Sequence, residues 1–319
     1  MWKYIAGRLL LSIPTLIGVT IVIFVAMRIL PGDPIAAMFG EEGGTLISDH
    51  DRAKIEESLG LRKPLYLQYL SWMSDIFRGR FGESFWRGDR ISVQIMRRGF
   101  ISLEIAIIAV TFSWVIGLPV GVLSALRQDS WLDYALRIPT VVFLAIPNFW
   151  LASIIVLVFI RAFDYMAPLG QVQFPWTNPV QNLQQVVPAG IVIGTSLAAV
   201  VARMSRSTFL EVIREDYIRT ARAKGLSVGM VMFRHALRNA VLPVITLSAI
   251  SLAHLIGGAV TTETAFNVPG LGKYLVDAQV ERDFNVVQNL VFVYAVVFLL
   301  VNLAVDLVYS WIDPRIRYA

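Results

Sequence analysis

The residues whose side chains could take part in binding or catalysis are concentrated in one charged stretch, residues 203–238. The sequence on both sides of it is almost uncharged. The stretch holds eight Lys or Arg and three carboxylates. It predicts two short helices that meet at Gly225, because glycine readily takes the left-handed conformation that ends a helix. One face of the first helix is predicted to carry Asp216, Tyr217, Thr220 and Lys224, which lie at i, i+1, i+4 and i+8. This pattern indicates recognition of a partner rather than catalysis.

A simpler reading of the same stretch is a solvated basic loop that only fixes the topology of a membrane protein. Such a loop needs no internal order. This one has a predicted helix, a glycine turn, a second predicted helix and an apolar Leu242-Pro243 step into the next run. The order favours a docking element over a plain basic loop.

Catalytic and cofactor chemistry is not expected of this chain. It has no cysteine and only three widely spaced histidines, so thiolate or histidine metal sites are not expected. A phosphate-binding loop is also missing, because Gly272-Lys273 is followed by Tyr274 rather than Ser or Thr. We expect a protein that is not an enzyme and binds no cofactor of its own.

Composition indicates a polytopic α-helical membrane protein. The 319 residues are 56% hydrophobic and 16% charged. The basic residues flank apolar runs, and these runs have roughly the 20 residues that are needed to cross a bilayer. Residues 1–30 hold the first predicted span, 31–99 a small external helical domain, and 100–319 the core domain. The other spans are predicted at about 100–126, 136–163, 188–202, 240–262 and 285–309, with cytoplasmic helices at 203–239 and both termini in the cytoplasm.

Glycine pairs in two of the spans predict close helix packing. Gly117 and Gly121 in the second span, and Gly190 and Gly194 in the fourth, have the spacing of two small residues separated by three. This spacing lets a neighbouring helix approach closely.

Several motifs together resemble one protein family. They are residues 211–225 with their continuation to Pro243, Pro31-Gly-Asp-Pro34, Pro269-Gly-Leu-Gly272 and Asp313-Pro-Arg-Ile-Arg317. The chain resembles, over nearly its whole length, the permease subunits of bacterial ABC importers for dipeptides, oligopeptides, nickel and glutathione. It departs from the sugar-type permeases, which carry Glu-Ala-Ala where this chain has Arg219-Thr220-Ala221.

The resemblance implies a fold, partners and a role. It implies the type I ABC importer permease fold with six transmembrane helices, in the bacterial inner membrane. It also implies a second homologous permease, two ATPase subunits that bind ATP and Mg, and an external binding protein that delivers di- or oligopeptides, or nickel, glutathione or oligosaccharides. The residues implied to contact the ATPase are Glu215, Asp216, Tyr217, Thr220, Ala221, Lys224 and Gly225.

Polar residues within the spans are candidates for the translocation path. They are Asn148, Ser248, Ser251, His254 and Thr262. His254 is the one ionisable residue deep in a predicted span, and a neutral imidazole bonded between helices is an alternative role for it. A secondary transporter or channel, and a membrane scaffold for a soluble enzyme, are the rival functions.

Overall fold

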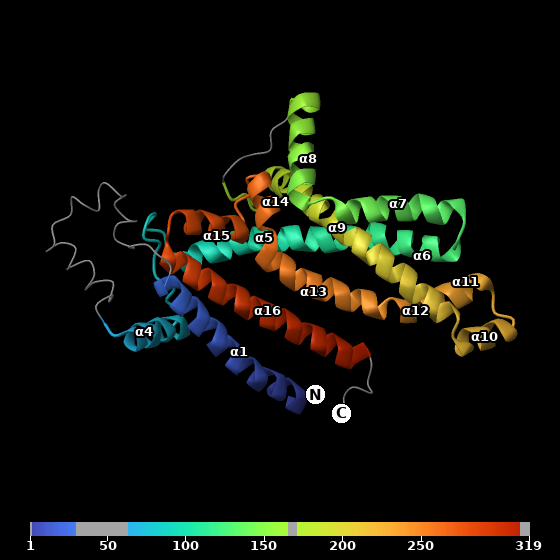
Figure 1. Ribbon diagram of the computed structural model, residues 1–319, viewed down its shortest axis with the longest axis horizontal. Coiled ribbons are helices and arrows are strands. Elements are labelled where there is room, and N and C mark those ends of the chain that lie inside the picture. Colours follow the sequence, from blue (N-terminus) through green and yellow to red (C-terminus); the bar gives the residue numbers. More distant parts are fainter. Residues whose placement is uncertain (1, 30–62, 165–170, 313–319) are drawn as a thin grey trace. The chain divides into compact units, whose positions relative to one another are not determined.

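The computed structural model describes residues 2–29, 63–164 and 171–312, and they are almost entirely helical (Figure 1). Among these residues the only strand-like pairing is an isolated bridge between Glu83 and Arg90. The chain divides into two compact units, one of residues 1–100 with 270–319 and one of residues 101–269. We call them the terminal unit and the central unit.

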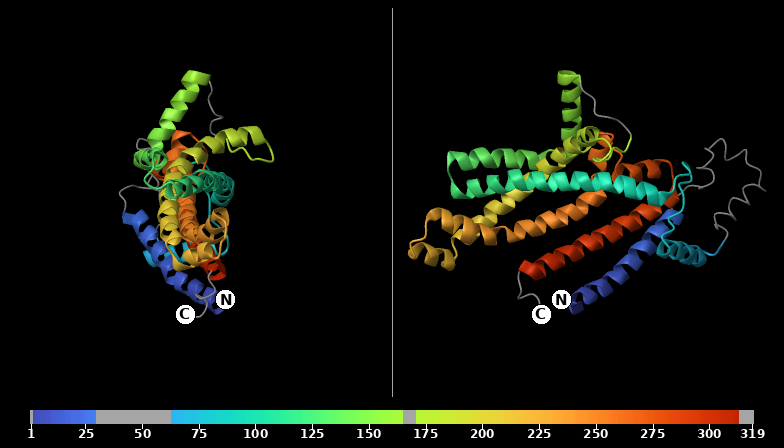
Figure 2. Two further views of the ribbon diagram at one scale, coloured as in Figure 1. Left: turned by 90° about the vertical axis from the view of Figure 1, so that its right-hand side faces the viewer. Right: turned by 180° about the vertical axis from the view of Figure 1, so that it is seen from behind.

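The terminal unit is built on two long helices, α1 (Trp2–Ile29) and α16 (Phe284–Ile312), which run side by side (Figures 1 and 2). Shorter helices α4 (Leu65–Phe77) and α15 (Leu271–Val280) and the first turns of α5 (Ile91–Phe112) complete it. The core cluster of this unit joins α5, α15 and α16, and its buried members include Ile91, Leu271, Tyr274, Val286 and Leu290.

Hydrogen bonds attach α4 to the two long helices. The hydroxyls of Thr20 on α1 and Tyr69 on α4 lie 2.8 Å apart. Trp72 donates its indole N–H to Asn289 on α16 at 3.2 Å. The apolar spacing of residues 65–77 predicts a helix, and α4 confirms it; the helix that the spacing of residues 51–61 predicts lies outside the described residues.

The turn after α4 is bonded to the loop before α16. The Asp283 carboxylate accepts from the Ser84 hydroxyl at 2.6 Å and from the Phe85 N–H at 2.9 Å. Arg87 lies 2.7 Å from Glu281, and this hydrogen bond raises the pKa of the guanidinium above its ordinary value. The described part of the predicted external domain, 63–99, thus packs with the C-terminal span in one compact unit.

The central unit contains the rest of α5, a π-helical turn η1 (Ser113–Gly117), and the helices that follow it. These are α6 (Leu118–Leu126), α7 (Trp131–Ala145), α8 (Asn148–Phe163), α9 (Pro179–Ile213), α10 (Asp216–Ala223), α11 (Val228–Met230), the π-helical η2 (Val231–Ala236), α12 (Leu237–Ala240), α13 (Leu242–Gly258) and α14 (Val260–Ala265). One core cluster joins α5, α8, α9 and α14, and a second joins α6, α9, α10 and α12.

The glycine pairs lie where helices touch. A Cβ atom added at Gly117 would stand 2.5 Å from the Ala198 carbonyl oxygen of α9, and one at Gly190 would stand 2.5 Å from Ile108 of α5. The prediction that these spacings admit a neighbouring helix is confirmed.

Gly121 gives the sharpest test of this packing. A Cβ atom there would stand 2.3 Å from the Ala202 carbonyl oxygen, so we expect Gly121→Ala to lower the free energy of unfolding by about 1–3 kcal/mol through overpacking. The control is Gly229→Ala, where nothing lies within 4 Å of the added atom. Thermal unfolding of the purified protein measures both, and equal midpoints would contradict close packing at Gly121.

Four helices in the described residues are long and apolar enough to cross a membrane, or up to six if each of two bent pairs counts as one span. The third predicted span, 136–163, is one of the bent pairs: α7 and α8 meet at 99°. The bend lies at Ile146–Pro147, because proline disfavours helical geometry in the residue before it. The third predicted span therefore corresponds to two helices with a sharp bend between them.

The helix that carries the fourth predicted span is longer than the span. The span is predicted to end at about residue 202, and α9 continues as one helix to Ile213. Residues 203–213 contain no Gly or Pro, and Phe209 is fully buried in the second core cluster, so the charged stretch begins as an extension of the span. Helix α9 thereby leads directly to α10.

Candidate coupling surface and translocation path

Helix α10 is short, and its ends explain its length. Asp216 lies in its first turn and Arg222 in its last, so both charges complement the helix dipole. At its end the Gly225 N–H donates to the Arg222 carbonyl and the Leu226 N–H to the Ala221 carbonyl, the pattern of a Schellman motif. Gly225 has a φ of +77°, so the predicted glycine turn is confirmed.

One side of α10 faces its own chain. Ile218 is 1% exposed and packs in the second core cluster with Phe209 of α9 and Val231 of η2. Ala221 is buried in the same cluster. The expectation that Ala221 contacts a partner is therefore corrected: its methyl group fixes α10 against the central unit.

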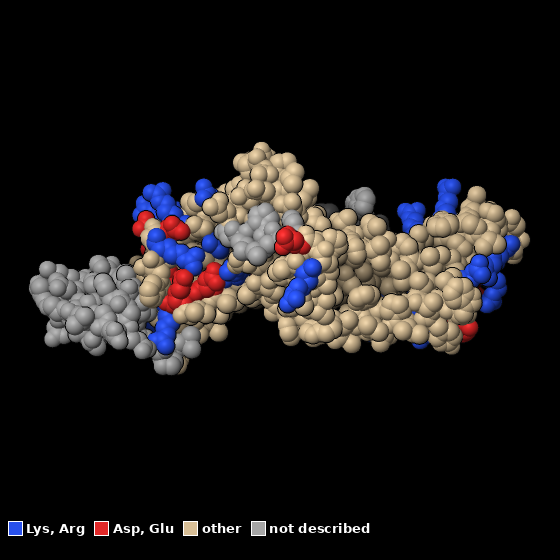
Figure 3. All heavy atoms as spheres, turned by 90° about the horizontal axis from the view of Figure 1, so that it is seen from above, with Lys and Arg blue, Asp and Glu red and all other residues tan. Residues whose placement is uncertain are grey.

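The other side of α10 is open. Asp216 is 91% exposed at its side chain, and Glu215, Tyr217, Thr220 and Lys224 are exposed as well. Asp216 and Arg219 form an ion pair at 3.3 Å, which contributes little because both groups are solvated. We call Glu215, Asp216, Tyr217, Thr220 and Lys224 the coupling face. Figure 3 shows one group of Lys and Arg side chains at the right-hand end of the view, where Figure 1 places α10; a second group, with Asp and Glu among it, lies toward the left.

Two hydrogen bonds attach this region to the start of the fifth span. Asn239 of α12 donates to the Tyr217 hydroxyl at 2.7 Å. The Thr208 hydroxyl of α9 donates to the Ala240 carbonyl at 2.9 Å. Helix α10 is therefore held to α12, and α12 to α9, by side-chain hydrogen bonds.

The bond between Tyr217 and Asn239 can be tested by a double-mutant cycle. We expect Tyr217→Phe and Asn239→Ala each to lower the free energy of unfolding, measured by thermal denaturation, by about 0.5–1.5 kcal/mol, the contribution of one hydrogen bond. The double variant should lose little more than either single one. Additive losses would mean that the two side chains act independently.

An apolar patch beside α10 was not predicted. Val228, Met230 and Phe233 are exposed, Phe233 to 69%. They follow Ser227, whose hydroxyl caps α11 by accepting from the Met230 N–H. Their signal in the sequence was the apolar run at 228–233 directly after the glycine turn, and an exposed patch of this kind suits a protein contact.

The structure does not gather the predicted path residues into one hydrogen-bonded group in the part that it describes. Ser248 is buried, donates to the Val244 carbonyl and accepts from the Trp114 indole at 2.7 Å. Thr262 is buried in α14. In this conformation both are packed inside the central unit, so a role in the path would require them to become exposed.

The other path candidates are placed differently. Asn148 at the start of α8 accepts a hydrogen bond from Ser196 of α9. Ser251 is half-buried and donates to the Leu247 carbonyl of its own helix. The side chain of His254 lies outside the described residues. For these three the path stays a prediction.

A buried carboxylate in α14 was also missed. Glu263 is the first charged residue after the uncharged run that follows Arg238, yet its side chain is 1% exposed and accepts a hydrogen bond from Ser102 of α5 at 2.7 Å. The only indication in the sequence that Glu263 is buried was its place in the polar run Thr-Thr-Glu-Thr.

Among the described residues, no group of three or more His, Cys, Asp or Glu side chains lies close enough together to hold a metal ion.

These features define a class: an α-helical membrane protein with an ordered charged helix that follows α9, the longest α-helix in the part of the chain that the structure describes. The comparisons define the family. The model of the binding-protein-dependent transport system inner membrane component matches residues 117–318, and the model of its N-terminal part matches residues 1–106. The chain belongs to this family of permeases, and it is a multi-pass component of the inner membrane.

Full-length relatives agree with that placement. The chain is 37% identical to the dipeptide transport system permease protein DppB of Alkalihalophilus pseudofirmus, over 100% of both chains. It is 39% identical to the oligopeptide transport system permease protein AppB of Bacillus subtilis, again over 100% of both. The glutathione transport system permease protein GsiC of Salmonella choleraesuis is 33% identical over the same shares.

A solved structure shows the same fold. It is an inward-facing conformation of the MetNI methionine ABC transporter, with a TM-score of 0.55. The match covers 69% of this chain and 96% of the other at 20% identity. The helical permease fold is therefore established for most of the chain.

Proposed function

We propose that this chain is the permease subunit of an ATP-driven importer of di- and oligopeptides, and that its coupling face docks on an ATPase subunit. The observation that carries the proposal is the rigid placement of α10: one side is packed in the core of the central unit and the other side is exposed and charged. The peptide permeases among its full-length relatives support the cargo.

In this proposal the chain pairs with a second, homologous permease to form the path. Two ATPase subunits bind on the cytoplasmic side and supply ATP hydrolysis, and an external binding protein delivers the peptide. Both termini lie in the cytoplasm, as the basic residues of the inner segments favour. The chain itself holds no cofactor and catalyses no reaction.

Docking of an ATPase subunit at α10 couples ATP hydrolysis to the movement of the transmembrane helices. Closure of two ATPase subunits displaces α10, and the contacts of Tyr217 and Thr208 pass the motion to α12 and α9. Rigid-body rotation of packed helices is a common way to switch between two states. To change the population ratio of two such states from 1:99 to 99:1, a partner must bind one state more strongly than the other by about 5.5 kcal/mol.

The test is peptide uptake into liposomes that contain the assembled complex, with binding protein and ATP on their correct sides. We expect the uptake of a labelled dipeptide to require ATP. An excess of glutathione or nickel should reduce this uptake only slightly. Uptake by the chain alone without ATP would instead support a secondary transporter. ATP-driven uptake of glutathione or nickel, but not of peptides, would keep the importer class and overturn the cargo.

A further inference from the structure

Helices α7 and α8 of the central unit meet at a sharp bend, and we call residues 142–150 the elbow. At its centre Ile146 and Pro147 both have extended backbone, and the two helices diverge from them at 99°. Figure 1 shows α8 standing away from the helices around it, with its first turns beside α9 and α14. The elbow and the later turns of α8 are therefore open to a neighbour.

The elbow lies at membrane depth. Residues 138–160, which extend to both sides of it, carry no charged side chain, and Arg137 and Arg161 bracket this run. Helix α7 has 15 residues and α8 has 16, so each is roughly 22–24 Å long and neither alone crosses a hydrocarbon core of about 30 Å. The bend therefore falls inside the bilayer rather than at its surface.

The end of α7 carries backbone groups that its own chain does not satisfy. Pro147 has no N–H, and the last bond of the helix runs from the Ile146 N–H to the Val142 carbonyl. In the part of the chain that the structure describes, the carbonyls of residues 143–146 accept no hydrogen bond. Helical carbonyls point toward the C-terminal end of their helix, and α8 turns away there, so these oxygens point past the elbow.

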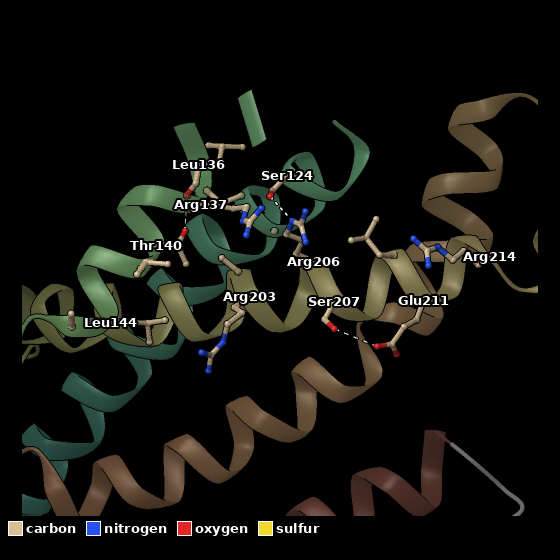
Figure 4. A pocket seen from close by; sticks show the side chains of 16 residues that line it. Ser124, Leu136, Arg137, Thr140, Leu144, Arg203, Arg206, Ser207, Glu211 and Arg214 are labelled. Atoms are coloured by element: carbon tan, nitrogen blue, oxygen red, sulfur yellow. Dashed lines mark hydrogen bonds between the residues drawn. The ribbon is translucent and has the colours of Figure 1, made fainter. Parts of the chain in front are cut away.

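A hollow beside α7 leaves its end uncovered on another side. The hollow has a volume of about 800 Å³ and lies between α6, α7 and α9. Leu144 and Ala145 line it at the end of α7, and Figure 4 shows Leu144 beside Arg203 of α9. The central unit therefore does not close around the end of α7 on this side.

Exposed apolar side chains surround the free carbonyls. Val142 is exposed in the last turn of α7, and Phe149 and Trp150 are exposed where α8 begins. Leu157 and Phe163 are exposed further along α8. The surface thus combines apolar side chains with hydrogen-bond acceptors at membrane depth.

We propose that the second permease packs on the elbow and on α8 within the membrane, and that it donates hydrogen bonds to the free carbonyls at the end of α7. The proposal rests on the proposed function, which pairs this chain with a homologous permease. Membrane helices associate through close packing and through hydrogen bonds from Ser, Thr, Asn and Gln side chains. A neighbouring membrane helix can therefore supply both kinds of contact that this surface requires.

Lipid and water each supply only one of them. Acyl chains suit Phe149 and Leu157 but have no donor, and a broken helix at membrane depth is tolerated only where protein or a water-filled cavity covers the break. Water would satisfy the carbonyls but would leave the apolar side chains of α8 in contact with water. In the proposed complex the ATPases and the binding protein act outside the bilayer, so the second permease is the partner at this depth.

The experiment uses the complete complex in liposomes, with a photo-crosslinking residue at one position at a time. Phe149→benzoylphenylalanine keeps an aromatic ring at the elbow. The matched control is Ile107→benzoylphenylalanine on α5, because the two side chains are exposed to a similar extent, 55% and 51%. After illumination, mass spectrometry identifies the molecule to which each position is joined.

We expect position 149 to crosslink to the second permease at least fivefold more often than position 107 does. Crosslinks from position 149 to lipid alone would overturn the proposal, because acyl chains would then cover the elbow. Crosslinks to this chain alone would also overturn it. Absence of any crosslink from position 149 in an assembled complex would overturn it as well and would indicate a water-filled space.

A pair of variants measures what the surface contributes to pairing. Phe149→Ala with Leu157→Ala removes two exposed side chains of α8, and the control Ile107→Ala with Val115→Ala removes two from α5 and η1. We expect the α8 variant to bind the second permease at least tenfold more weakly and the control to change less than twofold. Equal weakening in both would contradict a specific interface at α8.

ATP-driven dipeptide uptake into the same liposomes separates this proposal from the function. Loss of uptake with the crosslink to the second permease intact would defeat the importer proposal alone. Intact uptake without that crosslink would defeat the interface alone.

Discussion

Replacing Gly225 with proline is expected to abolish ATP-driven uptake and to release the ATPase subunits from the complex. Gly225 has a φ of +77°, whereas proline fixes φ near −65°, and its missing N–H removes the bond to the Arg222 carbonyl. The end of α10 would lose its Schellman motif, so the coupling face would no longer have a fixed position. Co-purification of the ATPase subunits with the permease pair measures the effect.

The matched control at this position is Gly225→Asn. Asparagine tolerates the left-handed conformation better than other residues with a side chain, and no atom lies within 4 Å of a Cβ added there. We expect the asparagine variant to keep the ATPase subunits and most of the uptake. Membrane insertion and pairing with the second permease should be unchanged in both variants. Retention of the ATPases by the proline variant would mean that the ordered end of α10 is not needed for docking.

Replacing Asp133 with asparagine is expected to destabilise the protein by about 3–5 kcal/mol, the usual cost of breaking a buried ion pair. Asp133 at the start of α7 is 0% exposed and accepts hydrogen bonds from Arg206, Ser124 and the Asp129 N–H. Asparagine keeps the shape but leaves the Arg206 guanidinium without its counter-charge. The turn between α6 and α7 would lose its attachment to α9.

Two comparisons make the Asp133 result specific. Glu211→Gln removes an exposed carboxylate on α9 and should shift stability by no more than about 0.5 kcal/mol. The double variant Asp133→Leu with Arg206→Met should recover much of the loss, because two apolar side chains can replace a buried pair at small cost. The thermal unfolding midpoint of the purified complex measures all three. An unfolding midpoint for Asp133→Asn equal to that of Glu211→Gln would contradict a structural role for the pair.

Local features of the fold could be predicted from the sequence. The apolar runs that became α1 and α16, the helix at 65–77 and the left-handed turn at Gly225 depend on residue type and spacing within a few turns. The glycine pairs also predicted close packing, although the partner helices were not identified. Such features require no knowledge of what lies opposite in space.

Features that depend on contacts between distant segments could not be predicted. The continuation of α9 to Ile213 depends on the burial of Phe209, and Ala221 faces inward because α10 packs on η2 and α12. The bond between Arg206 and Asp133 joins residues 73 positions apart in the sequence. The carboxylate of Glu263 was missed for the same reason, since Ser102 is 161 positions away.

The central claim is that the coupling face of α10 is the surface on which the ATPase docks, and single-cysteine crosslinking tests it most directly. The chain has no cysteine of its own, so one cysteine at a time can be introduced without background. Thr220→Cys lies on the exposed side of α10, whereas Ile218→Cys lies on its buried side in the same helix. With a short thiol-to-amine crosslinker on the assembled complex, we expect Thr220→Cys to join to the ATPase subunit and Ile218→Cys not to. Absence of a crosslink from Thr220→Cys in a complex that still transports peptide would contradict the claim and move the docking surface away from α10.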